Sequence, residues 1–190
     1  MTYWDYVKPP KVRRVLSFSL FNSLAKKMIP GISNIEVVPI DVYVDIIKDV
    51  VVKEDLKIIK NRGALVSYSK KFNTFYIILN TKVLSGGELV CNFFHELGHI
   101  KFGHIQKRKK GLPIKEIKKT EIEANNWAFN FLKKSCNFFS INQLPQLRRY
   151  FDIRNRVTQL SSIRELEVTG IDNALNVKRA VDEIVFGKKK

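Results

Sequence analysis

The alternation of apolar and polar residues predicts a small sheet followed by helices. Two β-rich runs, 64–69 and 74–80, flank the polar stretch Lys-Lys-Phe-Asn, which is typical of a β-hairpin. After the hairpin, apolar residues recur at helical spacing over 86–103 and again from about residue 120. This order predicts the α+β class, in which a small antiparallel or mixed sheet packs on two helices and a C-terminal helical region follows.

Two further helices are predicted before the hairpin. Residues 12–29 place Leu16, Leu20 and Leu24 on one apolar stripe, with the bases outside it. Such a stripe is expected to pack on its own domain, although a basic amphipathic helix can also lie on a membrane surface. The later segment IDVYVDIIKDV predicts a short helix, and the run VVVK predicts a strand.

The helix over 86–103 has its own start and stop signals. Ser85 and Glu88 have the spacing of a capping box, in which each side chain satisfies an amide at the start of a helix. Gly103 is suited to the end of the same helix. We therefore expect the helix to begin near Gly86.

The segment after this helix is expected to be a loop. Residues 105–119 are basic and are interrupted by Gly111 and Pro113. From about Thr120 the helical pattern resumes. Its buried stripe consists of Ala124, Trp127, Ala128, Phe131 and Leu132.

Beyond residue 140 the pattern predicts two short helices joined near 151–153, and then a final helix. The pair has a faint helix-turn-helix look, but its second helix carries no Asn or Gln pattern for reading bases, so docking or packing is favoured. The length of 190 residues suits one main domain with appendages. We expect an N-terminal basic helical extension (1–35), a core (36–140) and a C-terminal helical subdomain (141–190).

Composition excludes several classes of protein. Hydrophobic residues make up 45% and charged residues 27%, which is typical of a folded globular protein. No apolar run is long enough for a transmembrane segment, and the N-terminus lacks a signal-peptide pattern, so a cytoplasmic protein is expected. Two cysteines, Cys91 and Cys136, are too few for a disulfide scaffold.

The net charge of +16 is spread along the chain, with one local excess over 101–119. Such a charge can attract nucleic acid, an acidic protein or a membrane surface, and it names no partner by itself. Direct binding of nucleic acid therefore remains an alternative that is not favoured.

The stretch HELGH carries the clearest chemistry. His95 and His99 are four residues apart, so on a helix they share one face and can bind one zinc ion. Glu96 need not be a ligand, and it can serve as the general base and acid of a zinc peptidase. The alternative is a pair of ordinary surface histidines. The metzincin pattern is excluded, because it would require glycine and histidine where the chain has Phe102 and Ile105.

A catalytic zinc usually takes a third protein ligand, which we expect from TEIEANNWAFNFL. Glu121 and Glu123 are the candidates. Glu123 is preferred, because the amides of Asn126 and Asn130 on neighbouring turns can orient a ligating carboxylate. Trp127 would provide an aromatic wall beside it. Alternatively, either glutamate simply enriches a helix N-terminus, or Glu123 closes a capping box with Thr120.

Two other residues near HELGH have open roles. His104 cannot share the face of His95 unless the helix breaks first. It is then either a helix-end residue or a donor that approaches the site from the turn. Cys91, one helical turn before His95, is a soft ligand, an inhibitory thiolate or a packed core thiol, and the core role is favoured.

The segments FYIILN, HELGH and EIEANNWAFNFL together resemble the ImmA/IrrE family of zinc-dependent metallopeptidases. The resemblance covers about residues 39–135. It implies that His95, His99 and Glu123 are the zinc ligands, that Glu96 is the catalytic base, and that Asn125 matches the Asn or Asp of the family. The substrates it implies are helix-turn-helix repressors of mobile elements or stress genes.

We therefore predict a metallo-endopeptidase that binds one zinc ion per chain and cleaves a regulatory protein such as a repressor. Asn125, Asn126 and His104 are candidates for residues that surround the ligands. The alternative is a non-proteolytic regulator with the same fold that binds DNA or a partner protein.

Overall fold

A computed structural model describes residues 7–13, 16–32, 34–47, 63–84, 86–108, 111–135, 137–162, 174–185 and 187. The chain divides into two compact units, which we call the sheet unit (Val15–Gly111) and the helical unit (Met1–Arg14 with Leu112–Lys190). The division into an extension, a core and a C-terminal subdomain, with boundaries near 35 and 140, stays a prediction.

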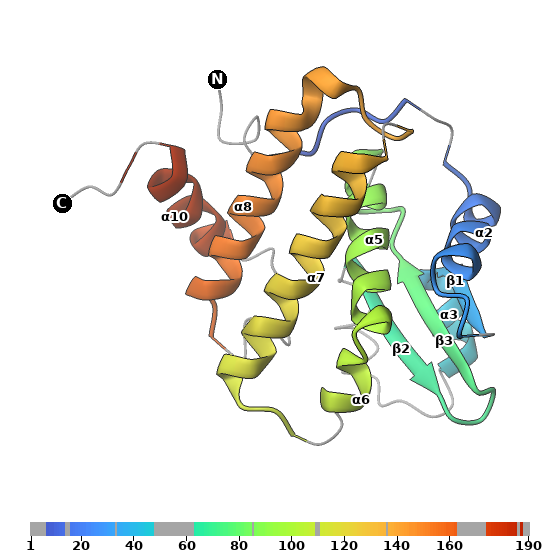
Figure 1. The fold of residues 1–190 in the computed structure, drawn as a ribbon. Helices are drawn as coiled ribbons and strands as arrows, with labels where there is room; N and C mark the ends of the chain where they lie inside the picture. The colour runs from blue at the N-terminus through green and yellow to red at the C-terminus, as the bar shows by residue number, and fades with distance from the viewer. Residues whose placement is uncertain are drawn as a thin grey trace. The chain divides into compact units, whose positions relative to one another are not determined.

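The sheet unit combines the sheet with four of the described helices (Figure 1). Its elements are α2 (Phe18–Met28), β1 (Ile35–Pro39), α3 (Ile40–Ile47), β2 (Ala64–Ser69), β3 (Thr74–Leu79), α5 (Gly87–Lys101) and α6 (His104–Arg108). The sheet has the order β1-β3-β2, with β3 in the centre. The predicted hairpin is confirmed, because β2 and β3 pair antiparallel with Ala64 opposite Leu79.

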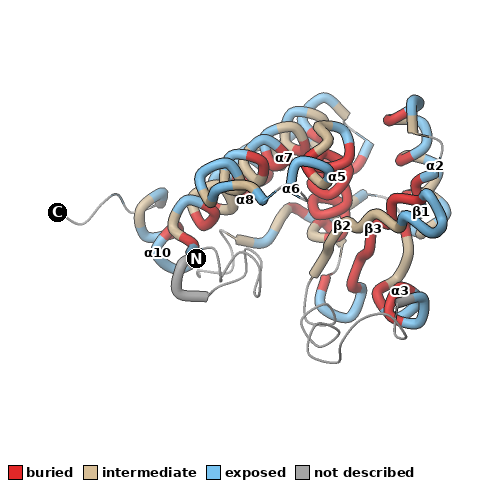
Figure 2. The backbone as a smooth tube through the Cα atoms, turned by 90° about the horizontal axis from the view of Figure 1, so that it is seen from below, coloured by how far each residue is buried: buried red, intermediate tan, exposed pale blue. Residues whose placement is uncertain are grey.

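The predictions missed β1, which makes the sheet mixed. It pairs parallel to β3, with Ile35 opposite Phe75. A parallel pair has no short turn that would mark it in the sequence, and β1 is only five residues long. Every residue of β3 is buried, as expected for a central strand that is covered on both faces (Figure 2). The fold is α+β, as predicted.

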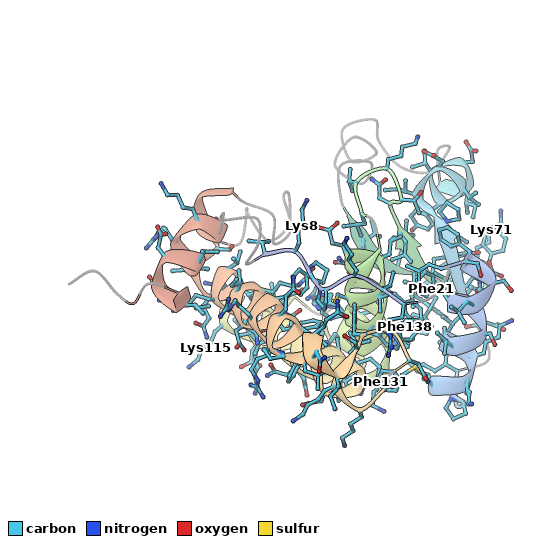
Figure 3. All side chains as sticks on the ribbon, turned by 90° about the horizontal axis from the view of Figure 1, so that it is seen from above. Lys8, Phe21, Lys71, Lys115, Phe131 and Phe138 are labelled. Carbon is cyan, nitrogen blue, oxygen red and sulfur yellow. The ribbon has the colours of Figure 1, made fainter. Side chains whose placement is uncertain are left out.

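Helix α2 begins later than predicted, at Phe18, because Ser17 caps it by accepting a hydrogen bond from the Leu20 amide at 3.1 Å. Its apolar side packs within its own unit. The Phe21 ring lies 4.6 Å from the Phe93 ring, and Asn22 exchanges two hydrogen bonds with the backbone of Val37 in β1. Figure 3 labels Phe21 on this helix.

Helices α3 and α5 occur where the sequence predicts them. Helix α3 packs on β3, while the VVVK segment lies outside the described residues. Helix α5 begins one residue after Gly86, which is its N-cap and provides no side-chain hydrogen bond. Ser85 is not among the described residues, so the predicted capping box is not confirmed.

The predicted loop over 105–119 is wrong. Its first residues form α6, and α7 already begins at Ile114, six residues before the expected start at Thr120. Pro113 precedes the first turn of α7, where a missing amide hydrogen costs nothing, so this proline starts a helix instead of prolonging a loop. The Thr120 hydroxyl donates to the Ile117 carbonyl from inside α7, which rules out a capping box with Glu123.

In the described residues of the helical unit there are three long helices. Its elements are α7 (Ile114–Lys134), the 3₁₀ turn η1 (Ile141–Gln143), α8 (Leu144–Leu160) and α10 (Ala174–Val185). Helix α8 continues through 151–153, where a break was predicted, because Phe151, Ile153 and Val157 form one buried stripe along it. The helix-turn-helix interpretation of this segment is therefore wrong.

Helix α8 is the centre of the helical unit. Ile153 and Val157 pack against Ala180 and Val181 of α10. Basic side chains occur in both units, including Lys71 at the hairpin turn and Lys115 in the first turn of α7 (Figure 3). In the described part of the chain, no helix has both the length and the apolar character that a membrane span requires.

Candidate active site

Helix α5 brings His95 and His99 together. Both residues are buried, each with 3% of its surface exposed, and their rings meet edge to face. Their Nε2 atoms are 3.1 Å apart. The four-residue spacing on one helix therefore produces the convergent pair that the sequence predicts.

The geometry of this histidine pair suits a shared metal ion. Two ligands at about 2.0–2.1 Å from a tetrahedral zinc would place their nitrogen atoms roughly 3.3 Å from each other. The observed 3.1 Å differs by only a few tenths of an ångström. Without a metal, the same distance suits a hydrogen bond in which one ring donates and the other accepts.

Glu96 follows His95 on the same buried helix and is 8% exposed. Among the described residues, none forms a hydrogen bond or ion pair with its carboxylate. A carboxylate in this position is able to accept a proton beside the histidine pair.

A glycine turn places His104 next to His99. Helix α5 ends at Lys101, and Gly103 adopts a left-handed conformation with φ of 65°, which a side chain would disfavour. The chain therefore reverses before α6, and the Nδ1 atoms of His104 and His99 come within 2.9 Å of each other. His104 is completely buried, and the Phe102 ring stacks against it.

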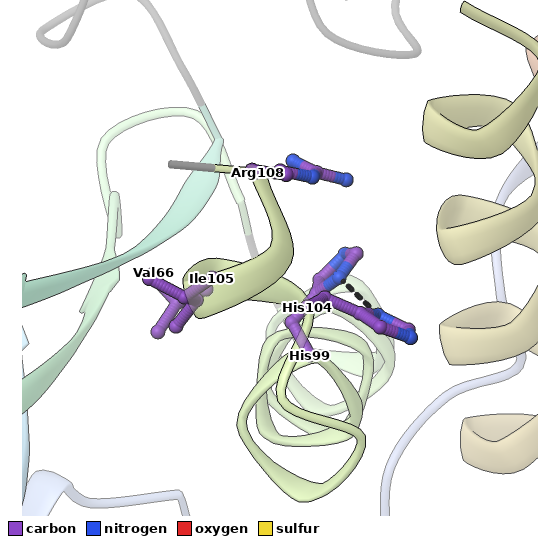
Figure 4. Close-up of a pocket in the computed structure, with 5 residues that line it drawn as sticks. All are labelled: Val66, His99, His104, Ile105 and Arg108. Carbon is purple, nitrogen blue, oxygen red and sulfur yellow. Dashed lines mark hydrogen bonds between the residues drawn. The ribbon is translucent and has the colours of Figure 1, made fainter. Parts of the chain in front are cut away.

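A pocket opens beside these two histidines. Its volume is about 330 Å³, and it is lined by Val66, His99, His104, Ile105 and Arg108 (Figure 4). Val66 of β2 and Ile105 of α6 provide apolar walls, and Arg108 provides a positive charge. The sequence did not point to Val66, because nothing local relates a strand residue to a histidine more than thirty positions later.

The two carboxylates considered as third ligands lie on different sides of α7. Glu123 is exposed, as are Asn126 and Asn130 on the following turns. Glu121 is half-buried, one helical turn before the buried Asn125. The preference for Glu123 stays a prediction, and its side chain is the more exposed of the two carboxylates.

Asn125 and Asn126 connect α7 to α8. The Asn125 amide donates to the Asn155 side chain at 2.9 Å and accepts from Arg154, and Asn155 donates in turn to Asn126. These bonds provide a structural role for both asparagines. Cys91 is completely buried in α5, in agreement with a core thiol.

Residues 73–160 match the model of the family Peptidase U49. The match covers slightly less than half of the chain and includes the whole of β3, α5, α6, α7, η1 and α8. No curated protein and no solved structure gives a significant match. The match supports a peptidase, and it does not confirm the resemblance to the ImmA/IrrE family.

Proposed function

We propose that this protein is a zinc-dependent metallo-endopeptidase. The observation that carries the proposal is the convergence of the His95 and His99 Nε2 atoms at 3.1 Å, next to Glu96 on one buried helix. This helix lies within the residues that match a peptidase family. A buried pair of imidazoles with an adjacent carboxylate is the arrangement that zinc peptidases use.

The third ligand in this proposal is a carboxylate of α7. The sequence favours Glu123, as does the resemblance to the ImmA/IrrE family. Burial favours Glu121 instead, because its side chain is half-buried whereas that of Glu123 is exposed. Two histidines and one glutamate leave a fourth position open for water or substrate, as in catalytic zinc sites.

Zinc, when bound, would polarise the scissile carbonyl and lower the pKa of a water molecule towards about 7. The residues of the chain then move the proton. A Glu96 carboxylate oxygen takes it from the attacking water as the bond from water oxygen to carbonyl carbon forms. The same oxygen passes it to the departing amide nitrogen as the carbon–nitrogen bond breaks.

The proposed substrate is a regulatory protein, such as a helix-turn-helix repressor of a mobile element or stress gene. Support comes from the resemblance of the HELGH and EIEANNWAFNFL segments to the ImmA/IrrE family. The rival function is a non-proteolytic regulator that binds DNA or a partner protein. The net charge of +16 favours this rival, because a basic surface attracts nucleic acid.

Co-production in cells tests this proposal. We expect a helix-turn-helix protein encoded beside this chain to be cut by the wild type and to stay intact with Glu96→Gln. Glu88→Gln, in the first turn of the same helix, is the matched control and should cut normally. Cutting by Glu96→Gln would refute the proposed mechanism. Salt-sensitive DNA binding that is indifferent to Glu96, without any cutting, would support the regulator instead.

A further inference from the structure

The contact between His99 and His104 restricts where their protons lie. Both rings approach through Nδ1, at a distance of 2.9 Å, and His104 is 0% exposed. A hydrogen bond between two ring nitrogens requires one donor and one acceptor, so a single proton lies between these two atoms. Either His99 donates to His104, or His104 donates to His99.

Only one of these arrangements is compatible with His99 as a metal ligand through Nε2. A ligating Nε2 carries no hydrogen, so the neutral His99 ring must carry its hydrogen on Nδ1. His104 then has to accept at Nδ1 and carry its own hydrogen on Nε2. In the reverse arrangement His99 would be protonated on Nε2, the atom that faces His95.

We propose that His104 is a positioning residue for the metal site, whose Nδ1 accepts the Nδ1 hydrogen of His99 and so directs the His99 Nε2 towards the metal. This inference rests on the proposed zinc function. Histidine ligands usually donate their second ring hydrogen to a carboxylate, a backbone carbonyl or water. Here the acceptor is another imidazole.

The local structure keeps His104 in the orientation that this role needs. The left-handed Gly103 reverses the chain between His99 and His104, and the Phe102 ring stacks on the His104 ring with an angle of 25° between the planes. Complete burial excludes competing water from the His104 side of the contact. A ring held in this way fixes the rotation of its partner.

A matched pair of substitutions separates positioning from packing. His104→Gln keeps an oxygen that can accept from His99, whereas His104→Leu has a similar size and no acceptor. By competition with a zinc chelator, we expect His104→Leu to bind zinc roughly 10–100-fold more weakly than the wild type. His104→Gln should stay within a few-fold of the wild type. Equal losses in both variants, or no loss in His104→Leu, would overturn the proposal.

The thermal midpoint of each metal-free variant shows whether the fold survives. If His104→Leu does not fold, the wild type still provides the test, because the chain has only three histidines to assign. In a nitrogen-15 NMR spectrum of the zinc-loaded wild type, we expect His99 to carry its hydrogen on Nδ1 and His104 on Nε2. A hydrogen on His104 Nδ1 would contradict the proposal.

Failure of this inference can be told apart from failure of the proposed function. A wild type that binds no zinc would remove the proposed function, and this inference with it. A wild type that binds one zinc ion while His104 shows the reverse proton placement would remove only the role of His104.

Discussion

Helices α5 and α7, which carry the proposed metal ligands, differ in how their polar residues are surrounded. On α5, His95, Glu96 and His99 lie in an unbroken run of buried residues, and the histidine rings contact one another. On α7, the polar side chains point to several sides of the helix and differ in burial. Asn125 is buried and bonded to α8, whereas Glu123 is exposed.

The two helices therefore show which parts of a site depend on residues close in sequence and which depend on the packing of distant segments. A four-residue spacing brings two side chains together on any helix, so the histidine pair depends on α5 alone. Glu121 and Glu123 are two residues apart, which places them about 200° from each other around α7. Which of them is available as a ligand depends on the packing of the whole helix.

The largest expected effect comes from removing one histidine of the pair. His95→Ala and His99→Ala should each lower zinc affinity by more than the roughly 100-fold that the loss of an outer hydrogen-bond partner costs. Chelator competition measures this change, with the thermal midpoint of the metal-free protein as a control for folding. Zinc binding of wild-type strength in either variant would mean that α5 does not provide the ligands.

A pair of carboxylate substitutions on α7 sharpens the comparison. We expect Glu121→Gln to weaken zinc binding by at least about 100-fold, because it removes a charged ligand, and Glu123→Gln to change it by less than a few-fold. Each variant is the matched control for the other, since both remove one negative charge from the same helix. The opposite order would establish Glu123 as the ligand, as the sequence suggested.

The asparagines of α7 should affect stability and not zinc affinity. Asn125→Ala leaves the half-buried partners Arg154 and Asn155 on α8 without these hydrogen bonds, so the free energy of unfolding should fall by about 1–3 kcal/mol. Asn126→Ala, at an exposed position, should cost less than about 0.5 kcal/mol. Denaturant unfolding of the metal-free proteins measures both. Similar losses would mean that burial of Asn125 contributes little to the connection between α7 and α8.

Local patterns predicted the hairpin, α5 and the histidine pair, because each depends on residues close in sequence. The parallel strand β1 was missed, since its pairing with β3 joins segments about forty residues apart. Pro113 was interpreted as part of a loop, although a proline before the first turn is compatible with a helix. The continuity of α8 likewise depends on its buried stripe. From the sequence alone, one long helix could not be distinguished from two short ones.

The position of His104 shows the same limit within the candidate site. Its approach to His99 requires the left-handed turn at Gly103 and burial beneath Phe102. The sequence contains both residues, but spacing on an ideal helix places His104 away from the pair. His104 can approach His99 because α5 ends at Lys101, before the ideal helix would carry His104 to the other side.

The most direct test is hydrolysis of fluorescently labelled casein while zinc is returned to the metal-free protein. We expect activity to rise and to saturate at one zinc ion per chain in the wild type. Glu96→Gln should bind zinc equally and be slower by roughly 10²–10⁴-fold, the usual contribution of a general base. Hydrolysis that is unchanged by zinc removal, or full activity of zinc-loaded Glu96→Gln, would contradict a zinc-dependent peptidase that uses Glu96.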